Sequence, residues 1–538
     1  MSFVENNSQQ ISFDDSLFNL TEREQRFLNS SWAKAFSDKV FPAIDEKRFS
    51  VLYSDKASRP NTPVNVIVGA MILKELMNLT DDELMQSLMF DVRYQYALHT
   101  TSFKEQPLSD RSLSRFRARL ISYETLTGID LIHECINSLS AEMASFMNIT
   151  PTLQRMDSLM ISANIRNLSM IELFYRCVAD LLKIMSKNND AIPENLSHYL
   201  EKDDYNKVVY HMRSINIKER IKTVLIDAVQ LSKLCSGTYN ETNEYQLLIR
   251  LLNEQSIEDD GKYRLRTKEE KVKGSHHLIN PADPEATFST KAGKKHFGYV
   301  ANVVESVGEN GSIVTEYMYE QNTHSDSEFA REYMESLPED GEETTLVTDG
   351  AYGSEGNSEI AKQHNVNFVN TNFTGSKPDE IYAEFVISED GSEIIECPNK
   401  QVPLKSKLTT RQKKNNQNKI YTAHYPKSTC EQCPYKDRCN PKFLKSTARK
   451  EVPYSMIRHA KQQLYMKTED FRKHARFRNG VETIPSILRR KYHVDRIPAH
   501  RRIPTKLHFG FKIAALNFNK LLKYLSSPAF CALQPERA

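Results

Sequence analysis

The chain has 538 residues, which is too many for one ordinary domain and predicts about two to four. Hydrophobic residues make up 39% of the chain and charged residues 26%, a composition that excludes a wholly disordered protein. The N-terminal segment lacks the basic and apolar stretches of a signal peptide, and no apolar run approaches the ~18 residues that span a bilayer. We therefore expect a cytoplasmic protein that has no membrane partner.

The net charge of +2 hides an uneven distribution of charge along the chain. Residues 401–525 contain 30 Lys and Arg but only 7 Asp and Glu, whereas the rest of the chain contains 42 and 63. Cations that neutralise phosphates supply most of the sequence-independent affinity of proteins for nucleic acid, so this basic block predicts a polyanionic partner. The alternative is that the block consists of solvated surface faces.

Residues 1–150 are predicted to form a helical domain. Thr80 and Glu83 have the spacing of a capping box at the start of one helix. A later helix carries Arg111 and Arg115 among apolar residues. Short helices followed by a basic amphipathic one are compatible with helix-turn-helix DNA binding, which makes these two arginines candidate DNA-binding residues. A helical bundle with an exposed basic face fits the same pattern.

Residues 151–370 have the pattern of a mixed α/β core. Near the start of this segment, Asp157 lies inside a strand-like run. Strand signals return at 296–306 and 312–320, which four turn-forming residues separate as in a hairpin. After a helix-like segment, a further short strand ends at Asp349.

Three other segments complete the predicted organisation. A helical insertion is expected within the core at about residues 164–275, and its last part, 255–275, is expected to be a loop. Residues 371–455 are polar and irregular, with some strand-like pieces, and carry four cysteines, and residues 456–538 are basic and mainly helical. The predicted fold class is therefore α/β, with a mixed-sheet core, an all-helical N-terminal domain and an irregular cysteine-containing insertion.

Asp157 and Asp349 are the central candidates for chemistry. Aspartate is disfavoured inside a strand, and a buried carboxylate is costly unless it is paired or binds a metal. Together with a third acid, two such residues can hold two Mg²⁺ ions, which activate the attacking oxygen and stabilise the leaving oxygen in phosphodiester cleavage. The alternative is that Asp349 begins a turn before Gly350 and that Asp157 caps a helix.

The cysteines fall into two groups. One close pair and two flanking cysteines can supply the four thiolates of a structural Zn²⁺ site: Cys397, Cys430, Cys433 and Cys439. The alternative for these four is a set of reduced free thiols in a loop-rich region. The others are scattered singly and are expected to be small buried apolar residues: Cys135, Cys177, Cys235 and Cys531.

Four segments resemble bacterial insertion-sequence transposases of the DDE type. Residues 156–165 (MDSLMISANI) resemble the first catalytic motif of that group, and residues 347–354 (VTDGAYGS) resemble the second. Residues 280–287 and 293–299 are similar to the segment that precedes the family's second strand, and residues 322–327 to the segment that follows its third. The four segments occur in the family's order, which makes the resemblance far more specific than any one of them.

The C-terminal part resembles the same group. Its signature combines Tyr, Arg, Glu and Lys, and Arg478, Glu482 and Arg489 are similar to the last three of these. The resemblance implies that Glu482 is the third catalytic acid and that the two arginines bind DNA.

Two departures from the family pattern bear on the third acid. Ala475 stands where the family has Tyr. Pro485 would kink a helix that ran through it, at a cost of roughly 3 kcal/mol, so a helix can instead begin at Pro485 and leave Glu482 just before it. Glu469 and Asp470 are the nearest substitutes for Glu482.

The resemblance covers about residues 40–525. It is closest to the cut-and-paste superfamily whose RNase H-like core is interrupted before the third acid, and within it to the insertion-sequence group called eleven-eighty-two. It implies that Asp157, Asp349 and Glu482 bind two Mg²⁺ ions, for which Mn²⁺ can substitute.

The implied function is cleavage at the terminal inverted repeats of the protein's own element, followed by strand transfer into target DNA. A homodimer is expected at synapsis, because two ends must be brought together, and nucleoid association is expected if the source is bacterial. Two alternatives stay open. One is a catalytically inactive DNA-binding relic or repurposed copy, and the other is an RNase H-like nuclease without strand transfer.

Overall fold

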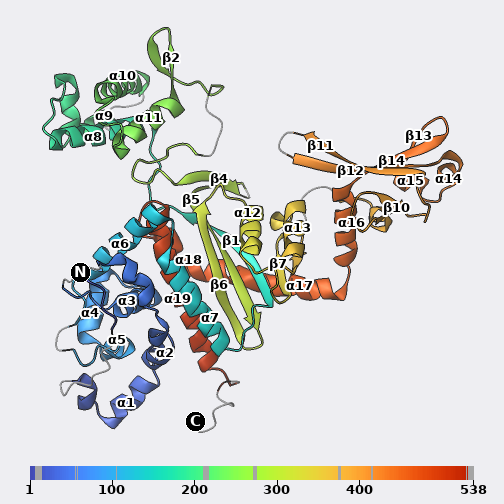
Figure 1. Ribbon diagram of the computed structural model, residues 1–538. Coiled ribbons are helices and arrows are strands. Elements are labelled where there is room, and N and C mark those ends of the chain that lie inside the picture. The colour runs from blue at the N-terminus through green and yellow to red at the C-terminus, as the bar shows by residue number, and fades with distance from the viewer. Residues whose placement is uncertain are drawn as a thin grey trace. The chain divides into compact units, whose positions relative to one another are not determined.

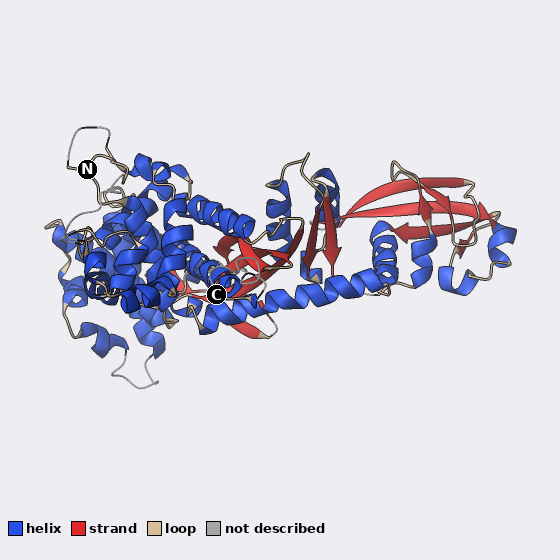
Figure 2. Ribbon diagram, turned by 90° about the horizontal axis from the view of Figure 1, so that it is seen from below, coloured by secondary structure: helices blue, strands red, loops and turns tan. Residues whose placement is uncertain are grey.

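The computed structural model shows a mixed α/β protein with many helices (Figures 1 and 2). It describes residues 1–6, 15–54, 56, 59–103, 106–209, 217–270, 276–291, 293–372, 377–413, 416–528 and 530. The chain divides into two compact units. The first unit comprises Met1–Thr150, Ser158–Ser325 and Ile484–Ala538, and the second unit comprises Pro151–Asp157 and Asp326–Thr483.

The N-terminal part of the first unit is helical, as predicted. Its α-helices are α1 (Glu22–Asn29), α2 (Trp32–Lys39), α3 (Val64–Met77), α4 (Asp81–Phe90), α5 (Val92–Ala97), α6 (Ser112–Thr127) and α7 (Leu131–Phe146). Short 3-10 helices precede α3: η1 (Ser16–Asn19), η2 (Phe41–Ala43) and η3 (Lys47–Leu52). The capping box predicted from Thr80 and Glu83 is confirmed at the start of α4. Helix α3 is buried along nearly its whole length and forms the centre of this bundle.

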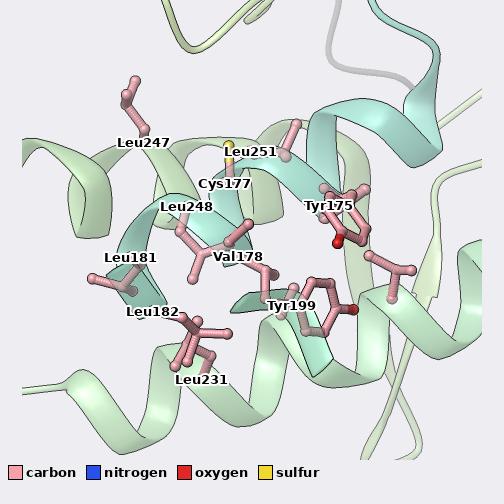
Figure 3. Close-up of a cluster of buried hydrophobic side chains, with 14 of the residues drawn as sticks. Tyr175, Cys177, Val178, Leu181, Leu182, Tyr199, Leu231, Leu247, Leu248 and Leu251 are labelled. Carbon is pink, nitrogen blue, oxygen red and sulfur yellow. The ribbon is translucent and has the colours of Figure 1, made fainter. Parts of the chain in front are cut away.

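A helical insertion, also predicted, follows β1 (Leu153–Ser162) in the chain. It consists of α8 (Met170–Lys187), η4 (Glu194–Leu200), α9 (Asp204–Val209), α10 (Ile217–Cys235) and α11 (Asn243–Gln255). Apolar side chains of these helices pack into a separate hydrophobic core, which includes Val178, Leu181, Leu231 and Leu248 (Figure 3). The expectation of a loop after this core is wrong for its first part, because β2 (Ser256–Asp259) and β3 (Lys262–Leu265) pair as an antiparallel hairpin.

The strands of the first unit have the order β4-β5-β1, with β6 also paired to β5. They are β4 (Thr287–Lys291), β5 (Lys294–Gly308) and β6 (Gly311–Gln321), and the predicted β5–β6 hairpin is confirmed, with Gly308 opposite Gly311. The long helix α19 (Arg502–Leu525) packs on α3, α7 and β6. Asn517 of α19 fixes this packing, because its amide both donates to and accepts from the backbone of Val314.

The second unit contains the first part of β1, which pairs in parallel with β7 (Thr344–Thr348), and β7 pairs in parallel with β8 (Val366–Asn370). Helices α12 (Asp326–Glu335) and α13 (Glu355–Gln363) and the 3-10 turn η6 (Gly350–Tyr352) accompany these strands. Tyr333 of α12 donates to Gln154 Oε1 at 2.6 Å, which ties the helix to β1.

The segment expected to be irregular is more regular than predicted. It holds η7 (Glu380–Glu384), β9 (Val386–Ile387), β10 (Ile394–Glu396), α14 (Lys427–Glu431), α15 (Lys436–Cys439) and a four-stranded sheet. The sheet has the order β11 (Lys405–Lys413), β12 (Asn416–Pro426), β14 (Thr447–Pro453) and β13 (Lys442–Phe443). One face of this sheet is buried in a cluster that includes Tyr421, Val452 and Ile457.

Helices end the chain, as predicted. After the four-stranded sheet come α16 (Tyr454–Tyr465), α17 (Glu469–Asn479), η8 (Gly480–Glu482) and α18 (Thr483–Arg490), and η9 (Val494–Arg496) precedes α19. Of the helices that the structure describes, none is both long enough and apolar enough to cross a membrane. Cys135, Cys177 and Cys235 are buried, as expected, whereas Cys531 lies outside the described residues.

Candidate active site

Two aspartates meet at one end of the parallel strands of the second unit. In the pairing of β1 with β7, Leu153 lies opposite Thr345 and Arg155 opposite Val347. The same register, extended by two residues, places Asp157 beside Asp349. The sequence folds this way because short runs of β-branched and apolar residues form both strands, and Gly350 allows the chain to turn directly after β7.

The Arg478 guanidinium lies among three carboxylates. Its Nη1 is 2.7 Å from Glu482 Oε1, and its Nη2 is 3.6 Å from Asp157 Oδ1 and 3.8 Å from Asp349 Oδ2. The Arg478 side chain is 14% exposed, and its Nε is buried without a hydrogen-bond partner among the described residues. The predicted catalytic acids and the predicted arginine are thus brought together around one cationic group.

The three acids differ in exposure and in their other contacts. The side chains of Asp157, Asp349 and Glu482 are 17%, 48% and 60% exposed. Asp349 Oδ1 accepts from the backbone N–H of Ala351 at 2.9 Å, so this residue does begin a turn, but its Oδ2 still faces Arg478. Asp157 lies within β1, and no helix begins there. Both aspartates therefore keep a carboxylate oxygen directed toward the guanidinium.

Pro485 does not exclude Glu482 from the site. The helical segment is interrupted, because α17 ends at Asn479, a 3-10 turn spans Gly480–Glu482, and α18 starts at Thr483. Pro485 therefore lies in the first turn of α18, where the missing N–H is tolerated. Glu482 is the last residue of the 3-10 turn, one helical turn after Arg478, as its four-residue spacing requires.

A cavity of about 460 Å³ adjoins these acids within the second unit. Asp349 and Arg478 line it together with Arg472 and Arg476 of α17. Ala475, at the position where a tyrosine was expected, also lines the cavity. Sequence reasoning missed Arg472 and Arg476, although their four-residue spacing, which puts both on one helical face, was a usable signal.

The two substitutes considered for Glu482 lie elsewhere on α17. Glu469 is 81% exposed and pairs with Arg472 at 3.4 Å, and Asp470 is 74% exposed and pairs with Lys473 at 3.3 Å. Neither contacts Arg478 in any ion pair of the described residues. Their position at the start of α17 is that of acids that stabilise a helix N-terminus.

The other predicted DNA-binding arginines belong to the first unit, whereas the acids belong to the second. Arg489 donates to the backbone oxygen of Met160 at 2.7 Å and lies 3.4 Å from Asp495 Oδ2, so it makes structural contacts within the first unit. Arg111 and Arg115 are exposed, Arg111 at the N-cap of α6 and Arg115 within that helix.

The four clustered cysteines are free thiols on or beside the small sheet of the second unit. Burial, followed by the neighbouring Cys439, Cys397 and Cys433, raises the pKa of Cys430 to about 11, so its thiol keeps its proton at neutral pH. Among the described residues, no group of three or more His, Cys, Asp or Glu side chains is arranged to hold a metal ion. The predicted zinc site is therefore not found in this part of the chain, and the three acids around Arg478 do not form such a group either.

Two comparisons with known families bear on these residues. Residues 25–119 match the family described as Transposase domain (DUF772), and residues 396–522 match the family described as Transposase DDE domain. The two matches support an insertion-sequence transposase of the DDE type. The DDE match includes Arg478 and Glu482, whereas Asp157 and Asp349 lie outside both matched segments. No curated protein and no solved structure matches the chain.

Proposed function

We propose that this transposase cuts DNA at the ends of its own element and joins the freed 3′ ends to target DNA. Asp157, Asp349 and Glu482 are its metal-binding acids. The observation that carries the proposal is the convergence of these carboxylates, which come from β1, the end of β7 and η8, on the single guanidinium of Arg478.

The donor set suits divalent metal ions. Three carboxylates that face one cation are the ligands that Mg²⁺ takes in combination with water and phosphate oxygens, and Mn²⁺ accepts the same donors. Bound ions of this kind activate the attacking oxygen and stabilise the leaving oxygen of the phosphodiester. DDE transposases generally use divalent metal ions, and in this chain Arg478 offsets one of the three negative charges of the acids.

Arg478 has a second role in this proposal. A guanidinium binds phosphate through two parallel hydrogen bonds, and Arg478 borders the cavity that also contains Arg472 and Arg476. A DNA strand in this cavity would place its phosphates between these arginines and the acids. The arginines orient the strand, and Asp349, which lines the same cavity, faces the phosphodiester to be cut.

The four-stranded sheet of the second unit supplies a basic surface for DNA. Its register places Lys442 opposite Arg449, Arg449 opposite His424, and His424 opposite Lys405. Residues directly opposite each other share a face, so these four side chains form one row across four strands. The adjacent Glu451 pairs with Arg449 at 3.2 Å.

This row, which we call the basic sheet face, favours a polyanion. Neighbouring cations on one face repel each other, and a bound phosphate backbone removes that repulsion. The opposite face of the sheet is buried in its own core, so only the basic sheet face is available to a partner. We assign it to duplex DNA near the cutting site.

The remaining roles follow from the chemistry of transposition. Residues 1–150 bind the element's ends, with Arg111 and Arg115 among the contacts. Residues 151–370 and 456–538 form the RNase H-like catalytic core, and residues 371–455 are the insertion that carries the basic sheet face. Two ends must be joined in one reaction, so the transposase acts as a homodimer at synapsis.

The test is cleavage of labelled DNA that carries the gene's flanking sequences, in Mg²⁺ or Mn²⁺. The wild type is expected to nick at the element's boundary and to join the freed end to a plasmid target. Asp157→Ala, Asp349→Ala and Glu482→Gln are expected to bind the same DNA but to nick it much more slowly. Their loss of nicking rate should exceed the roughly 10- to 100-fold loss of activity that follows removal of a residue that only contacts a metal ligand.

Glu469→Gln is the matched control, because Glu469 is a nearby glutamate outside the acid cluster. Nicking without joining would favour a nuclease. Binding without any cutting in either metal would show an inactive relic. A loss of activity in Glu469→Gln but not in Glu482→Gln would reassign the third acid.

A further inference from the structure

The first unit contains a second arginine-lined cavity, far from the acids in sequence. It has a volume of about 490 Å³ and lies between the segment that precedes α3 and the N-terminal half of α6. Arg59, Arg115 and Arg119 line it, and no Asp or Glu is among its lining residues in the described part of the chain. We call it the arginine pocket.

Among the described residues, no carboxylate neutralises the charges of these three arginines. No ion pair joins Arg59, Arg115 or Arg119 to a carboxylate among the described residues, whereas Arg117 of the same helix pairs with Asp81. Arg115 and Arg119 lie one turn apart on one face of α6, and like charges at this spacing destabilise a helix. The uncompensated repulsion favours a negatively charged occupant.

Two further features of the pocket favour an anion. Ser109 and Ser112 line it at the start of α6, a helix of 16 residues whose N-terminus has no side-chain cap. The N–H of Ser112 donates to the backbone oxygen of Ser109, but the helix dipole still attracts negative charge there. Tyr53 also lines the pocket, and the Arg119 guanidinium lies 4.8 Å from the centre of its ring, which holds the arginine in place.

We propose that the arginine pocket binds one backbone phosphate of the DNA that the first unit contacts, with Arg59 and Arg119 acting together with Arg115. This inference rests on the proposed function, because it names how that DNA is held. A guanidinium reads a phosphate and not a base edge, so the pocket positions DNA and adds affinity without reading its sequence. Burial raises the pKa of Tyr53, so its hydroxyl stays protonated and can donate to a phosphate oxygen.

The experiment measures binding of the full-length protein to labelled duplexes by fluorescence anisotropy over a range of salt concentrations. One duplex carries the element's end, and the other is a scrambled sequence. The test variants are Arg59→Ala, Arg119→Ala and the Arg59→Ala/Arg115→Ala double variant. Arg26→Ala is the matched control, because Arg26 is an exposed arginine of the first unit outside the pocket.

The double variant is expected to weaken binding to both duplexes by a similar factor, about ten-fold or more. It should also lower the slope of log affinity against log salt by about one. Arg26→Ala should change neither quantity. A further variant, Arg115→Lys, should keep most of the affinity for both duplexes, because it keeps the positive charge. If Arg115 only filled space, the charge of its replacement would not matter. Melting temperatures of all variants confirm that they are folded.

Other outcomes overturn the proposal in distinguishable ways. If the wild type binds DNA and the variants bind with the same dependence of affinity on salt, the arginine pocket does not bind a DNA phosphate. The proposed function then stands. A wild type that binds neither duplex refutes both. Millimolar inorganic phosphate that stabilises the wild type but not the double variant, while both bind DNA equally, assigns the pocket to a free anion instead of a DNA phosphate.

Discussion

Arg478 contacts each of the three acids that the sequence singles out for metal chemistry. Its guanidinium lies within 3.8 Å of all three carboxylates, and the side chain is nearly buried. Without this cation, three negative charges would repel each other in a partly desolvated place. The arginine therefore stabilises the acid cluster and also competes with metal ions for it.

Replacement of Arg478 by alanine separates these two effects. The Arg478→Ala variant is expected to bind Mn²⁺ about ten-fold more tightly in the absence of DNA, which corresponds to the loss of roughly 1.4 kcal/mol of competing attraction. The same variant should cut DNA more slowly, because a phosphate contact is lost. Calorimetric titration with Mn²⁺ measures the first effect, and Arg476→Ala is the control that leaves the acid cluster intact. Unchanged or weaker Mn²⁺ binding would show that Arg478 does not compete with metal.

The sequence was sufficient to name these residues but not to describe their contacts. Asp157, Asp349, Arg478 and Glu482 were all chosen from motifs and spacing. The role of Arg478 as a shared partner of the acids was not visible, because it depends on how α17 approaches the ends of β1 and β7. No metal-holding group of His, Cys, Asp or Glu is found among the described residues, so the zinc site and the metal site of the three acids both stay predictions.

At the scale of elements, local patterns with a strong turn or capping signal were predictable. The β5–β6 hairpin and the start of α4 follow from Gly308, Gly311, Thr80 and Glu83. Only some strand-like pieces are predictable in the four-stranded sheet β11-β12-β14-β13, because its strands are rich in Lys, Arg, Asn and Gln. Those residues have low β-propensity, and pairing with distant strands over a buried face outweighs that local preference.

Gly298 lies in β5 at a position where a side chain is expected to lower the free energy of unfolding. Its φ of +137° is a conformation that side chains rarely adopt, and a Cβ there would lie 2.4 Å from the backbone oxygen of Ile161. Gly298→Ala should therefore destabilise the first unit by about 2–4 kcal/mol, since neither backbone segment can move without breaking the pairing of β5 with β1. Urea unfolding followed by the fluorescence of Trp32, the single tryptophan, measures the change.

Gly356 provides the opposite case within a helix. It lies in the first turn of α13, and a Cβ there would meet no atom within 4 Å. Gly356→Ala should be neutral or stabilise the protein by up to about 1 kcal/mol, because alanine loses less entropy on folding. Equal stabilities of the two glycine variants would contradict the packing described for Gly298.

A buried ion pair links α3 to α19 in the first unit. Burial would raise the pKa of Glu75, but hydrogen bonds from His508 and Lys512 and the charge of Lys512 outweigh burial and lower it to about 2. Because the folded pKa is depressed, the stabilisation is fully present above the unfolded pKa of about 4.5. It is lost as pH falls toward 2, and it amounts to about 3 kcal/mol.

Glu75→Gln should therefore lower the free energy of unfolding by about 3 kcal/mol at pH 7, and the difference from wild type should vanish near pH 2. Trp32 fluorescence in urea at several pH values is the measurement. Glu142→Gln, an exposed glutamate on α7, is the control and should change little. A difference between Glu75→Gln and wild type that does not depend on pH would contradict the ion pair.

At the scale of the whole molecule, the proposed chemistry is concentrated in one of the two units. Pro151–Asp157 and Asp326–Thr483 together contain the three acids, Arg478 and the basic sheet face. The N-terminal helices, the helical insertion and α19 belong to the other unit. Of the 30 Lys and Arg of residues 401–525, 20 belong to the unit that contains the acids and 10 to the other unit.

Reversal of charge on the basic sheet face tests this division. The Lys405→Glu/Lys442→Glu double variant should weaken binding to any duplex and lower the slope of log affinity against log salt by about two, because two phosphate contacts are lost. Lys362→Glu, which changes an exposed lysine on α13, is the control. A salt slope that does not change in the double variant would remove the sheet from the DNA surface.

The most direct test of the central claim replaces Mg²⁺ by Fe²⁺ in the full-length protein and adds ascorbate and peroxide, so that radicals cut the backbone beside the bound metal. If Asp157, Asp349 and Glu482 form one metal site, mass spectrometry should find cuts within a few residues of all three. Excess Mg²⁺ should suppress these cuts, and Asp157→Ala or Asp349→Ala should abolish them. Cuts confined to the cysteine segment or to the region of Glu469, or cuts that persist in both aspartate variants, would contradict the account.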